Sequence, residues 1–500
     1  MRFPRSAGLL LHPTSLPGPH GSGDLGPDAY RFVDWLASAG QTLWQLLPLG
    51  NAGAGHSPYS SPSAFAGNVA LIDLAELQRH GWLDADDLRP EPGFDARRVA
   101  FAQVLPFRMQ RLARAALRFA AVATPAARDD FEAFCAAHAS WLGDYALFAA
   151  IGEAHPERDW CDWPRPLARR EPAALAEAAE ALAGRVFFWQ FTQWCFFRQW
   201  RALKAHAMQR GVRIVGDAPI FVAHHSADVW ARPQLFELDA EGRPTLVAGV
   251  PPDYFSPTGQ RWGNPLYRWP AHAAEGFAWW TERIGRTVEL VDVLRIDHFR
   301  GFAACWEIDA REPTAIHGRW APAPGEALFD AVARALGPLP IIAEDLGIIT
   351  PDVTALRKRF DFPGMAVLQF AFGRANPGDV RYLPHSHEPD SVVYTGTHDN
   401  DTTPGWWRAV DEDVRHHVRE YFACDGSQVH WDFIRAANAS VADLAIVPMQ
   451  DVLGLGSEHR MNLPGTAEGN WSWRFGWDDV PQDAAWRLAH LASLYQRRPG

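Results

Sequence analysis

Acidic residues stand at the ends of several apolar runs, which is an unusual place for a charge. Asp217 follows the run VRIVG, Glu344 follows PIIA, and Asp399 stands in the segment SVVYTGTHDN. One carboxylate in such a position can be a cap or a salt-bridge partner. Several that converge repel one another and shift each other's pKa, so a cluster of them indicates a chemical use.

Two kinds of chemistry fit such a cluster. Carboxylates together with a histidine, such as His398 beside Asp399, could hold a divalent metal. A pair of carboxylates could instead cleave a glycosidic bond, one as nucleophile and the other as acid. Arg295 lies two residues before Asp297, so both side chains project to the same side of a strand. A guanidinium there keeps a buried nucleophile ionised, whereas a metal site gains nothing from an added cation. The pattern favours sugar chemistry.

The composition narrows the choice of partners. The chain has 500 residues and a formal net charge of −12, so it lacks the basic surface that nucleic acids require. Its 23 tryptophans supply flat apolar rings on which sugar rings stack. The five cysteines are scattered without a C-x-x-C spacing, which argues against disulfides and structural zinc. No apolar stretch approaches the roughly 18 residues of a membrane span, and we expect a cytoplasmic protein with no membrane partner.

Eight short apolar runs must position these polar groups. Each reads as a strand buried on both faces, as in a parallel sheet covered by helices. Helical stretches such as DAYRFVDWLASAG lie between several of the runs, so we predict an α/β fold, a (β/α)8 TIM barrel. The alternative is a doubly wound open sheet. The runs are residues 8–12, 42–48, 212–219, 291–298, 340–347, 365–370, 391–400 and 444–451.

The spacing of the runs is uneven, which predicts insertions in a single catalytic barrel spanning 1–500. An inserted, mostly helical subdomain is expected at about 50–205, after the second strand. Its segment VFFWQFTQWCFFRQWRALKAH is apolar almost all round and predicts a buried helix. A second insertion, at about 218–290 after the third strand, is expected to carry a lid over the active site.

The sequence resembles the 4-α-glucanotransferases, also called amylomaltases or disproportionating enzymes, of the α-amylase-like superfamily. The resemblance runs nearly end to end, and the motifs in order make it specific. They are LLLHPTSLPGPHGSGDLG (9–26), LWQLLPLG (43–50), SPYSSPSAFAGN (57–68), GDAPIFVAHHSADVW (216–230), GVPPDYFSPTGQRWGNPLY (249–267), LRIDHFRGF (294–302), AEDLG (343–347) and YTGTHDNDTT (394–403).

The resemblance implies a retaining mechanism with three catalytic carboxylates. By motif matching, Asp297 is the nucleophile and Glu344 is the acid and base. Asp399 grips sugar hydroxyls near the cleavage point. A raised pKa is expected for Glu344, because it must begin protonated beside other acids. No cofactor and no metal are expected, since the carboxylates perform the chemistry.

The resemblance also implies a set of substrate-binding residues. Arg295 should orient the nucleophile, and the stretch 249–267, with Tyr254 and Phe255, should form the lid. Each residue has a structural alternative, such as a strand-end cap for Asp217, a core histidine for His398 or a packed ring for Trp262. The expected substrate-binding residues are Tyr59, Asp217, Trp262, Arg295, His398 and Asn470, and His12 could line the floor.

The function that the resemblance implies is transfer of α-1,4-glucan segments between maltooligosaccharides or to glucose. Two alternatives stay open at this stage. A hydrolase would use the same residues with water as acceptor, and a non-catalytic glycogen-binding protein would use none of them chemically. The expected partners are α-1,4-glucans, maltooligosaccharides and glucose, and the expected assembly is a monomer or small homo-oligomer.

Overall fold

The predicted barrel is confirmed by the computed structural model, which describes residues 3–91, 93–252, 256–372 and 380–498. Eight parallel strands form one sheet in the order β10-β11-β12-β1-β2-β3-β6-β9, and each coincides with one of the eight apolar runs. The open, doubly wound alternative is therefore wrong. The strands are β1 (Ser6–Leu10), β2 (Leu43–Gln45), β3 (Arg213–Pro219), β6 (Val293–Asp297), β9 (Ile341–Ala343), β10 (Gly364–Val367), β11 (Ser391–Tyr394) and β12 (Leu444–Pro448).

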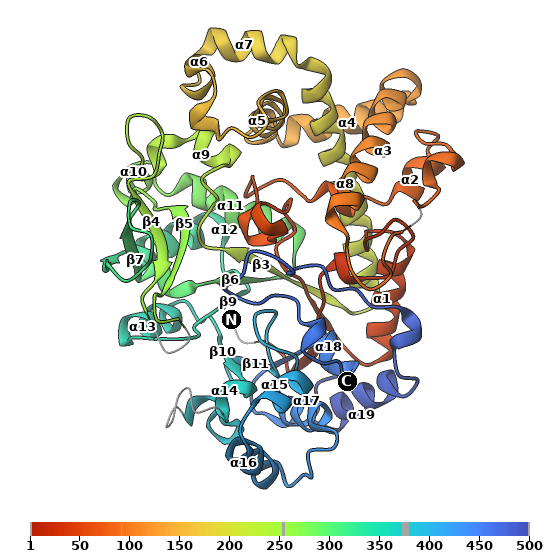
Figure 1. Ribbon diagram of the computed structural model, residues 1–500, viewed down its shortest axis with the longest axis vertical. Helices are drawn as coiled ribbons and strands as arrows, with labels where there is room; N and C mark the ends of the chain where they lie inside the picture. The colour runs from red at the N-terminus through yellow and green to blue at the C-terminus, as the bar shows by residue number, and fades with distance from the viewer. Residues whose placement is uncertain (1–2, 92, 253–255, 373–379, 499–500) are drawn as a thin grey trace.

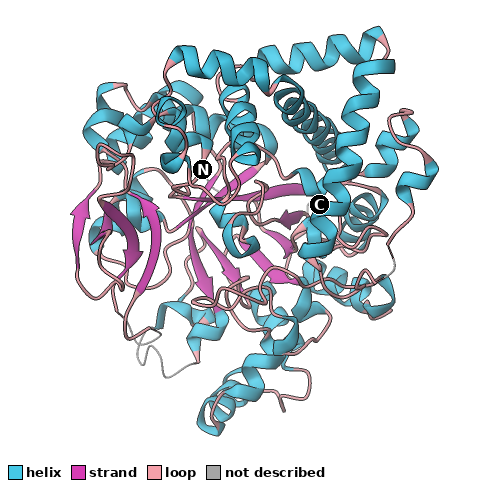
Figure 2. Ribbon diagram, turned by 45° about the horizontal axis from the view of Figure 1, so that its top comes forward, coloured by secondary structure: helices cyan, strands magenta, loops and turns pink. Residues whose placement is uncertain are grey.

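The barrel strands are buried on both faces, which explains their uninterrupted apolar runs. All five residues of β1 and all five of β12 are buried. In Figure 2 the strands lie at the centre of the molecule with helices around them. Side chains that point inward fill the barrel, and those that point outward meet the helices, so neither face favours polar residues.

The barrel closes between its first and last strands, β10 and β9. A backbone hydrogen bond of 2.9 Å crosses this seam, from the amide of Ala343 to the carbonyl of Pro363. The side chain of Asp345 adds a further contact across this seam, by accepting from the amide of Met365 in β10.

The helices that accompany the barrel surround it in both views (Figures 1 and 2). Within the described ranges, no helix is long and apolar enough to cross a membrane. Outside the β2–β3 connection the helices are α1 (Pro27–Ser38), α9 (Ala227–Ala231), α10 (Trp269–Ala274), α11 (Ala278–Leu290), α12 (Gly325–Leu336), α13 (Pro351–Arg359), α14 (Leu368–Ala371), α15 (Thr403–Ala409), α16 (Glu412–Phe422), α17 (Val429–Ala439), α18 (Met449–Val452) and α19 (Ala484–Leu494).

The long connection between β2 and β3 is mostly helical and extends to the upper end of the molecule in Figure 1. Its longest helix, α8, buries Phe191, Trp194 and Trp200, as the apolar segment predicted. Gln193 of α8 both accepts from the amide of Gly67 and donates to its carbonyl, at 2.7 and 3.0 Å. This helix thereby fixes the loop that carries Tyr59. The helices of the connection are α2 (Leu74–Arg79), α3 (Phe101–Val122), α4 (Pro125–Ala137), α5 (Leu142–Ala154), α6 (Arg165–Ala168), α7 (Pro172–Ala181) and α8 (Ala183–Gln209).

A second, antiparallel sheet stands beside the barrel and was not predicted from the sequence. It has the order β5-β4-β7-β8 and lies at the left of Figure 2. Two of its strands come from the connection after β3, where the lid was expected, and two from the connection after β6. Tyr254 and Phe255 of the expected lid lie outside the described residues. The strands are β4 (Leu246–Val250), β5 (Gln260–Pro265), β7 (Ala304–Asp309) and β8 (Gly318–Pro322).

Candidate active site

The carboxyl ends of the parallel strands bring the predicted acids to one face of the barrel. Asp217 lies in β3, Asp297 ends β6, and Glu344 follows β9 directly. These three strands are neighbours in the sheet, with β6 between the other two. Asp399 follows β11 in the chain. Polar groups at the carboxyl ends of barrel strands are where active sites of this fold are built.

Arg295 lies at the centre of the cluster and is almost fully buried. Its guanidinium binds both carboxylate oxygens of Asp217, at 2.8 and 2.7 Å, and reaches an oxygen of Asp297 at 2.9 Å. Burial alone would lower the pKa of Arg295, but the carboxylates of Asp217 and Asp297 hold that pKa well above its ordinary value. The arginine therefore stays charged and offsets two carboxylates at once.

Tyr59 joins the same cluster from the loop after β2. Its hydroxyl donates to Asp217 at 2.8 Å, and its ring stacks on His398 with 5.1 Å between centroids and 14° between planes. Trp471 contacts both rings, at 5.8 and 6.0 Å. The backbone amide of Tyr59 is held by the Ser57 hydroxyl at 3.2 Å. The result is an aromatic wall beside the carboxylates.

Glu344 accepts hydrogen bonds from two backbone amides. The amide of His298 donates to one oxygen at 2.7 Å and that of Leu346 to the other at 2.8 Å. Burial, and next the negative charge of Asp297, raise the pKa of Glu344 to about 7. A carboxyl with such a pKa can both give and take a proton near neutral pH.

His298 has a left-handed backbone with φ of 52°, which is costly for a residue with a side chain. This turn directs its amide at Glu344. Its ring meets the edge of Trp262 at 4.8 Å and 87°, and the Trp262 side chain is 39% exposed. Trp262 of β5 therefore lies beside the end of β6, where Asp297 stands, and its side chain is partly exposed to solvent.

Asp399 is held by a loop from near the end of the chain. Asn462 donates to its carboxylate at 2.7 Å, and Arg460 donates to its backbone carbonyl at 2.8 Å. His398 lies 3.3 Å from the same carboxylate oxygen that Asn462 contacts. These contacts orient the Asp399 side chain at the rim of the site.

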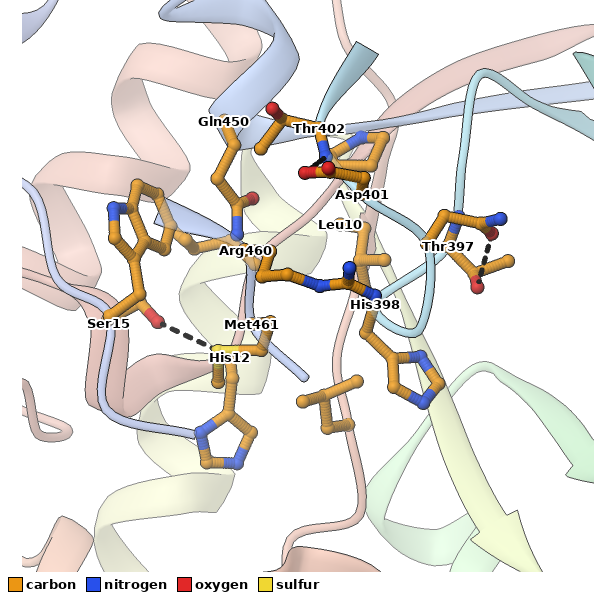
Figure 3. Close-up of a pocket in the computed structure, with 15 residues that line it drawn as sticks. Leu10, His12, Ser15, Thr397, His398, Asp401, Thr402, Gln450, Arg460 and Met461 are labelled. Atoms are coloured by element: carbon orange, nitrogen blue, oxygen red, sulfur yellow. Dashed lines mark hydrogen bonds between the residues drawn. The ribbon is translucent and has the colours of Figure 1, made fainter. Parts of the chain in front are cut away.

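A pocket adjoins this part of the site, between the segments that follow β1, β11 and β12. Figure 3 shows His12 and His398 among its lining residues, together with Arg460 and Met461 from the segment after β12. Burial lowers the pKa of His12 to about 4, so this ring is neutral near pH 7. Its Nδ1 bonds the hydroxyl of Thr14 at 2.7 Å, which fixes the ring in place.

The structure brings most of the predicted residues together, but Asn470 bonds elsewhere. Its side chain accepts from the amide of Leu463 and donates to Thr466, so it braces its own loop. The sequence analysis missed Asn462 and Trp471, which contact the site from that same loop. The residues joined by direct contacts are Tyr59, Asp217, Arg295, Asp297, His398 and Asp399. Glu344 joins them through the amide of His298, the residue after Asp297, and Trp262 borders the cluster through the ring of His298.

Comparison with known proteins identifies the family. A family model described as 4-alpha-glucanotransferase matches residues 11–478. The chain belongs to the 4-alpha-glucanotransferase family. The family member from Thermus thermophilus is 52% identical over 99% of this chain and 100% of its own length. That from Synechocystis sp. is 50% identical over 99% and 98%. The solved amylomaltase of Streptococcus agalactiae, in complex with acarbose, has 37% identity and a TM-score of 0.96 over 99% of this chain and 100% of its own.

The buried ion cluster generates a prediction for stability in this family member. Arg295→Met should lower the free energy of unfolding by about 3–5 kcal/mol, because it leaves Asp217 buried without its cation. The double variant Arg295→Met with Asp217→Leu should recover part of that loss. Urea denaturation would measure both. As a control, Arg311→Met removes an exposed partner of Asp309 and should leave the midpoint unchanged. An equal loss of unfolding free energy in Arg295→Met and Arg311→Met would contradict the role of the buried cluster.

Proposed function

We propose that this family member is a retaining 4-α-glucanotransferase that uses Asp297 as nucleophile and Glu344 as acid and base. One observation carries the proposal. Arg295 keeps Asp297 paired with a cation at 2.9 Å, while burial and the charge of Asp297 keep the pKa of Glu344 at about 7. Two neighbouring carboxyls thus lie in different surroundings, Asp297 against a guanidinium and Glu344 buried beside a negative charge, as the two roles require.

The first step forms a glycosyl-enzyme. An oxygen of Asp297 attacks the anomeric carbon of the donor glucan while the bond from that carbon to the leaving 4-oxygen breaks. The proton of Glu344 passes to the leaving oxygen, and the shortened glucan departs with a free hydroxyl. Asp297 becomes a neutral ester and Glu344 becomes a carboxylate.

The second step reverses the proton's path with another sugar. Esterification removes the negative charge of Asp297, which is one cause of the raised pKa of Glu344. The pKa of Glu344 therefore falls, which keeps it ionised and ready to act as a base. It takes the proton of the acceptor's 4-hydroxyl as that oxygen attacks the anomeric carbon. The ester bond breaks, and Asp297 regains its charge.

The remaining residues of the cluster would hold the donor sugar. Asp399 and His398 present polar atoms beside each other, 3.3 Å apart, and Tyr59 presents an aromatic ring next to them. A hydroxyl-bearing ring suits this combination of charged acceptors and a flat apolar face. Asp217, already bound by Arg295 and Tyr59, would reach hydroxyls of the next sugar ring. The substrates would be α-1,4-glucans, maltooligosaccharides and glucose, and the enzyme would act on them in the cytoplasm.

The hairpin of β4 and β5 would favour sugar over water as the acceptor. Trp262 lies against His298, whose amide binds Glu344, so a sugar stacked on this indole would meet the base. Water is abundant, and an acceptor sugar must therefore compete through binding and orientation. The partly exposed face of Trp262 supports a role as the acceptor platform.

The first test is the product pattern from pure maltotriose without added metal. We expect glucose and a ladder of longer maltooligosaccharides, resolved by chain length. Glu344→Gln should lower kcat about 10²–10⁴-fold, since it removes the acid and base, while glucan affinity is retained. Glucose and maltose as the sole products would identify a hydrolase instead. An unchanged rate in Glu344→Gln would contradict the assigned role.

The protonation of Glu344 predicts the pH dependence of kcat/KM. The free enzyme needs the protonated acid for the first step, so between pH 5 and 9 the activity is highest below the pKa of Glu344. It is lost as the pH rises through about 7, which is the value that burial and Asp297 produce. Initial rates of maltotriose disproportionation across pH 5–9 would reveal this alkaline limb. An alkaline limb absent up to pH 9 would rule out Glu344 as the proton donor.

The acceptor platform predicts a change in the ratio of transfer to hydrolysis. Trp262→Ala should lower this ratio about tenfold, as expected for the loss of about 1–1.5 kcal/mol of ring stacking. The measurement compares free reducing ends with newly formed longer chains. Trp486→Ala on α19, whose side chain is 67% exposed, is a matched control and should keep the ratio. A ratio unchanged in Trp262→Ala would refute the platform.

A further inference from the structure

The barrel's seam lies directly beside Glu344. The strand β9 ends at Ala343, and its backbone bond to Pro363 is the last before the chain reaches Glu344. On the other side of the seam β10 begins at Gly364 and pairs with β11. A buried amide on the seam side of β10 needs an acceptor, since an unpaired one is costly.

The side chain of Asp345, the residue after Glu344, supplies that acceptor. One of its oxygens accepts from the amide of Met365 in β10 at 2.7 Å. The other forms an ion pair with Arg357 of α13 at 3.1 Å. Arg357 also donates to the carbonyl of Phe362, just before β10, at 3.0 Å. The carboxylate therefore bridges the end of β9 to the start of β10 and to the helix between them.

Gly364 lets the two strands approach closely enough for this bridge. A Cβ atom at position 364 would lie 2.5 and 2.8 Å from the two carboxylate oxygens of Asp345. Both oxygens are fixed, by Met365 and Arg357, so they cannot move aside without breaking a contact. A side chain at this position would push the carboxylate out of the seam.

The loop after Asp345 is held by two further arginines. Arg381 donates to the carbonyl of Gly347 at 3.0 Å, and Arg300 donates to that of Ile348. These contacts hold residues farther along the loop. Asp345 differs from them because its own side chain is anchored, directly next to Glu344. Adjacent side chains on extended backbone point to opposite sides, so Asp345 points into the seam while Glu344 points to the site.

We propose that Asp345 is a positioning residue for Glu344: its carboxylate bridges the barrel seam and so fixes the backbone from which the acid and base projects. The inference rests on the proposed role of Glu344. It assigns no proton transfer to Asp345, whose two oxygens are directed into the seam. A shift of Glu344 by about 1 Å would cost up to about 10²-fold in rate.

The test separates acid and base catalysis from the rest of the reaction. Maltotriose needs Glu344 in both steps. With α-maltotriosyl fluoride as donor and azide as acceptor, fluoride leaves without a proton and azide attacks without a base. Asp345→Asn should lower kcat for maltotriose about 10–100-fold with a KM changed less than about threefold. With the fluoride and azide its rate should stay within about threefold of wild type.

Two further variants make the result decisive. Gly364→Ala keeps every charge but displaces the carboxylate, so it should reproduce the same split, and it carries the test if Asp345→Asn does not fold. Asp330→Asn on α12 removes an exposed ion pair of 2.8 Å to Arg359, which lies on α13 as Arg357 does, and should change neither reaction. Rates that fall equally with both donors, or do not fall with maltotriose, would overturn the proposal.

The same assay distinguishes this inference from the proposed function. Glu344→Gln should show the split most strongly. If it does not, the role of Glu344 is wrong, whatever Asp345 does. If Glu344→Gln shows the split while Asp345→Asn and Gly364→Ala match wild type, then the proposed function stands and the positioning role of Asp345 is overturned.

Discussion

A buried guanidinium shared between two carboxylates is the constraint on which the site depends. Arg295 and Asp217 are direct partners in the register between β6 and β3, and Asp297 follows Arg295 by two residues on the same side of the strand. A slip of one residue would turn these charges toward the opposite face, where none of them has a partner. The cost of an unpaired buried charge thus fixes the register of β6 against β3. Tyr59 then reaches Asp217 from a loop that α8 holds in place.

The same cluster gives the carboxyl groups of Asp297 and Glu344 different electrostatic surroundings. Arg295 lies against Asp297, whereas Glu344 receives its hydrogen bonds from two neutral amides and feels the charge of Asp297. After burial, the negative charge of Asp297 is therefore the next cause of the raised pKa of Glu344. A change of charge on Asp297 during the proposed reaction alters Glu344 in the direction that the next step needs.

Much of the fold and the site could be predicted because burial leaves a pattern in the sequence. The eight strands were visible as apolar runs, since both faces of a barrel strand exclude polar residues, and the acids were visible because they interrupt those runs. Asn462 and Trp471 lie in an irregular loop far along the chain, where no periodicity indicates which side chain points inward. The second sheet was missed because the strands Gln260–Pro265 and Gly318–Pro322 hold a single buried residue between them and contain glycine and proline, so neither forms an apolar run.

Asp345 shows how far a sequence pattern can mislead about a neighbour. It stands beside Glu344 in the motif AEDLG, directly after the same apolar run, and nothing in the sequence separates the two side chains. In the structure their backbone turns one side chain to the site and the other to the seam, where it meets Met365 and Arg357. Asp297 ends β6, which pairs with β3 and β9, whereas Glu344 follows β9, which pairs as a strand with β6 alone within the described sheet. At the seam, the side-chain contacts of Asp345 therefore take the place of the strand pairing that holds Asp297. The position of Glu344 thus depends on how the barrel closes.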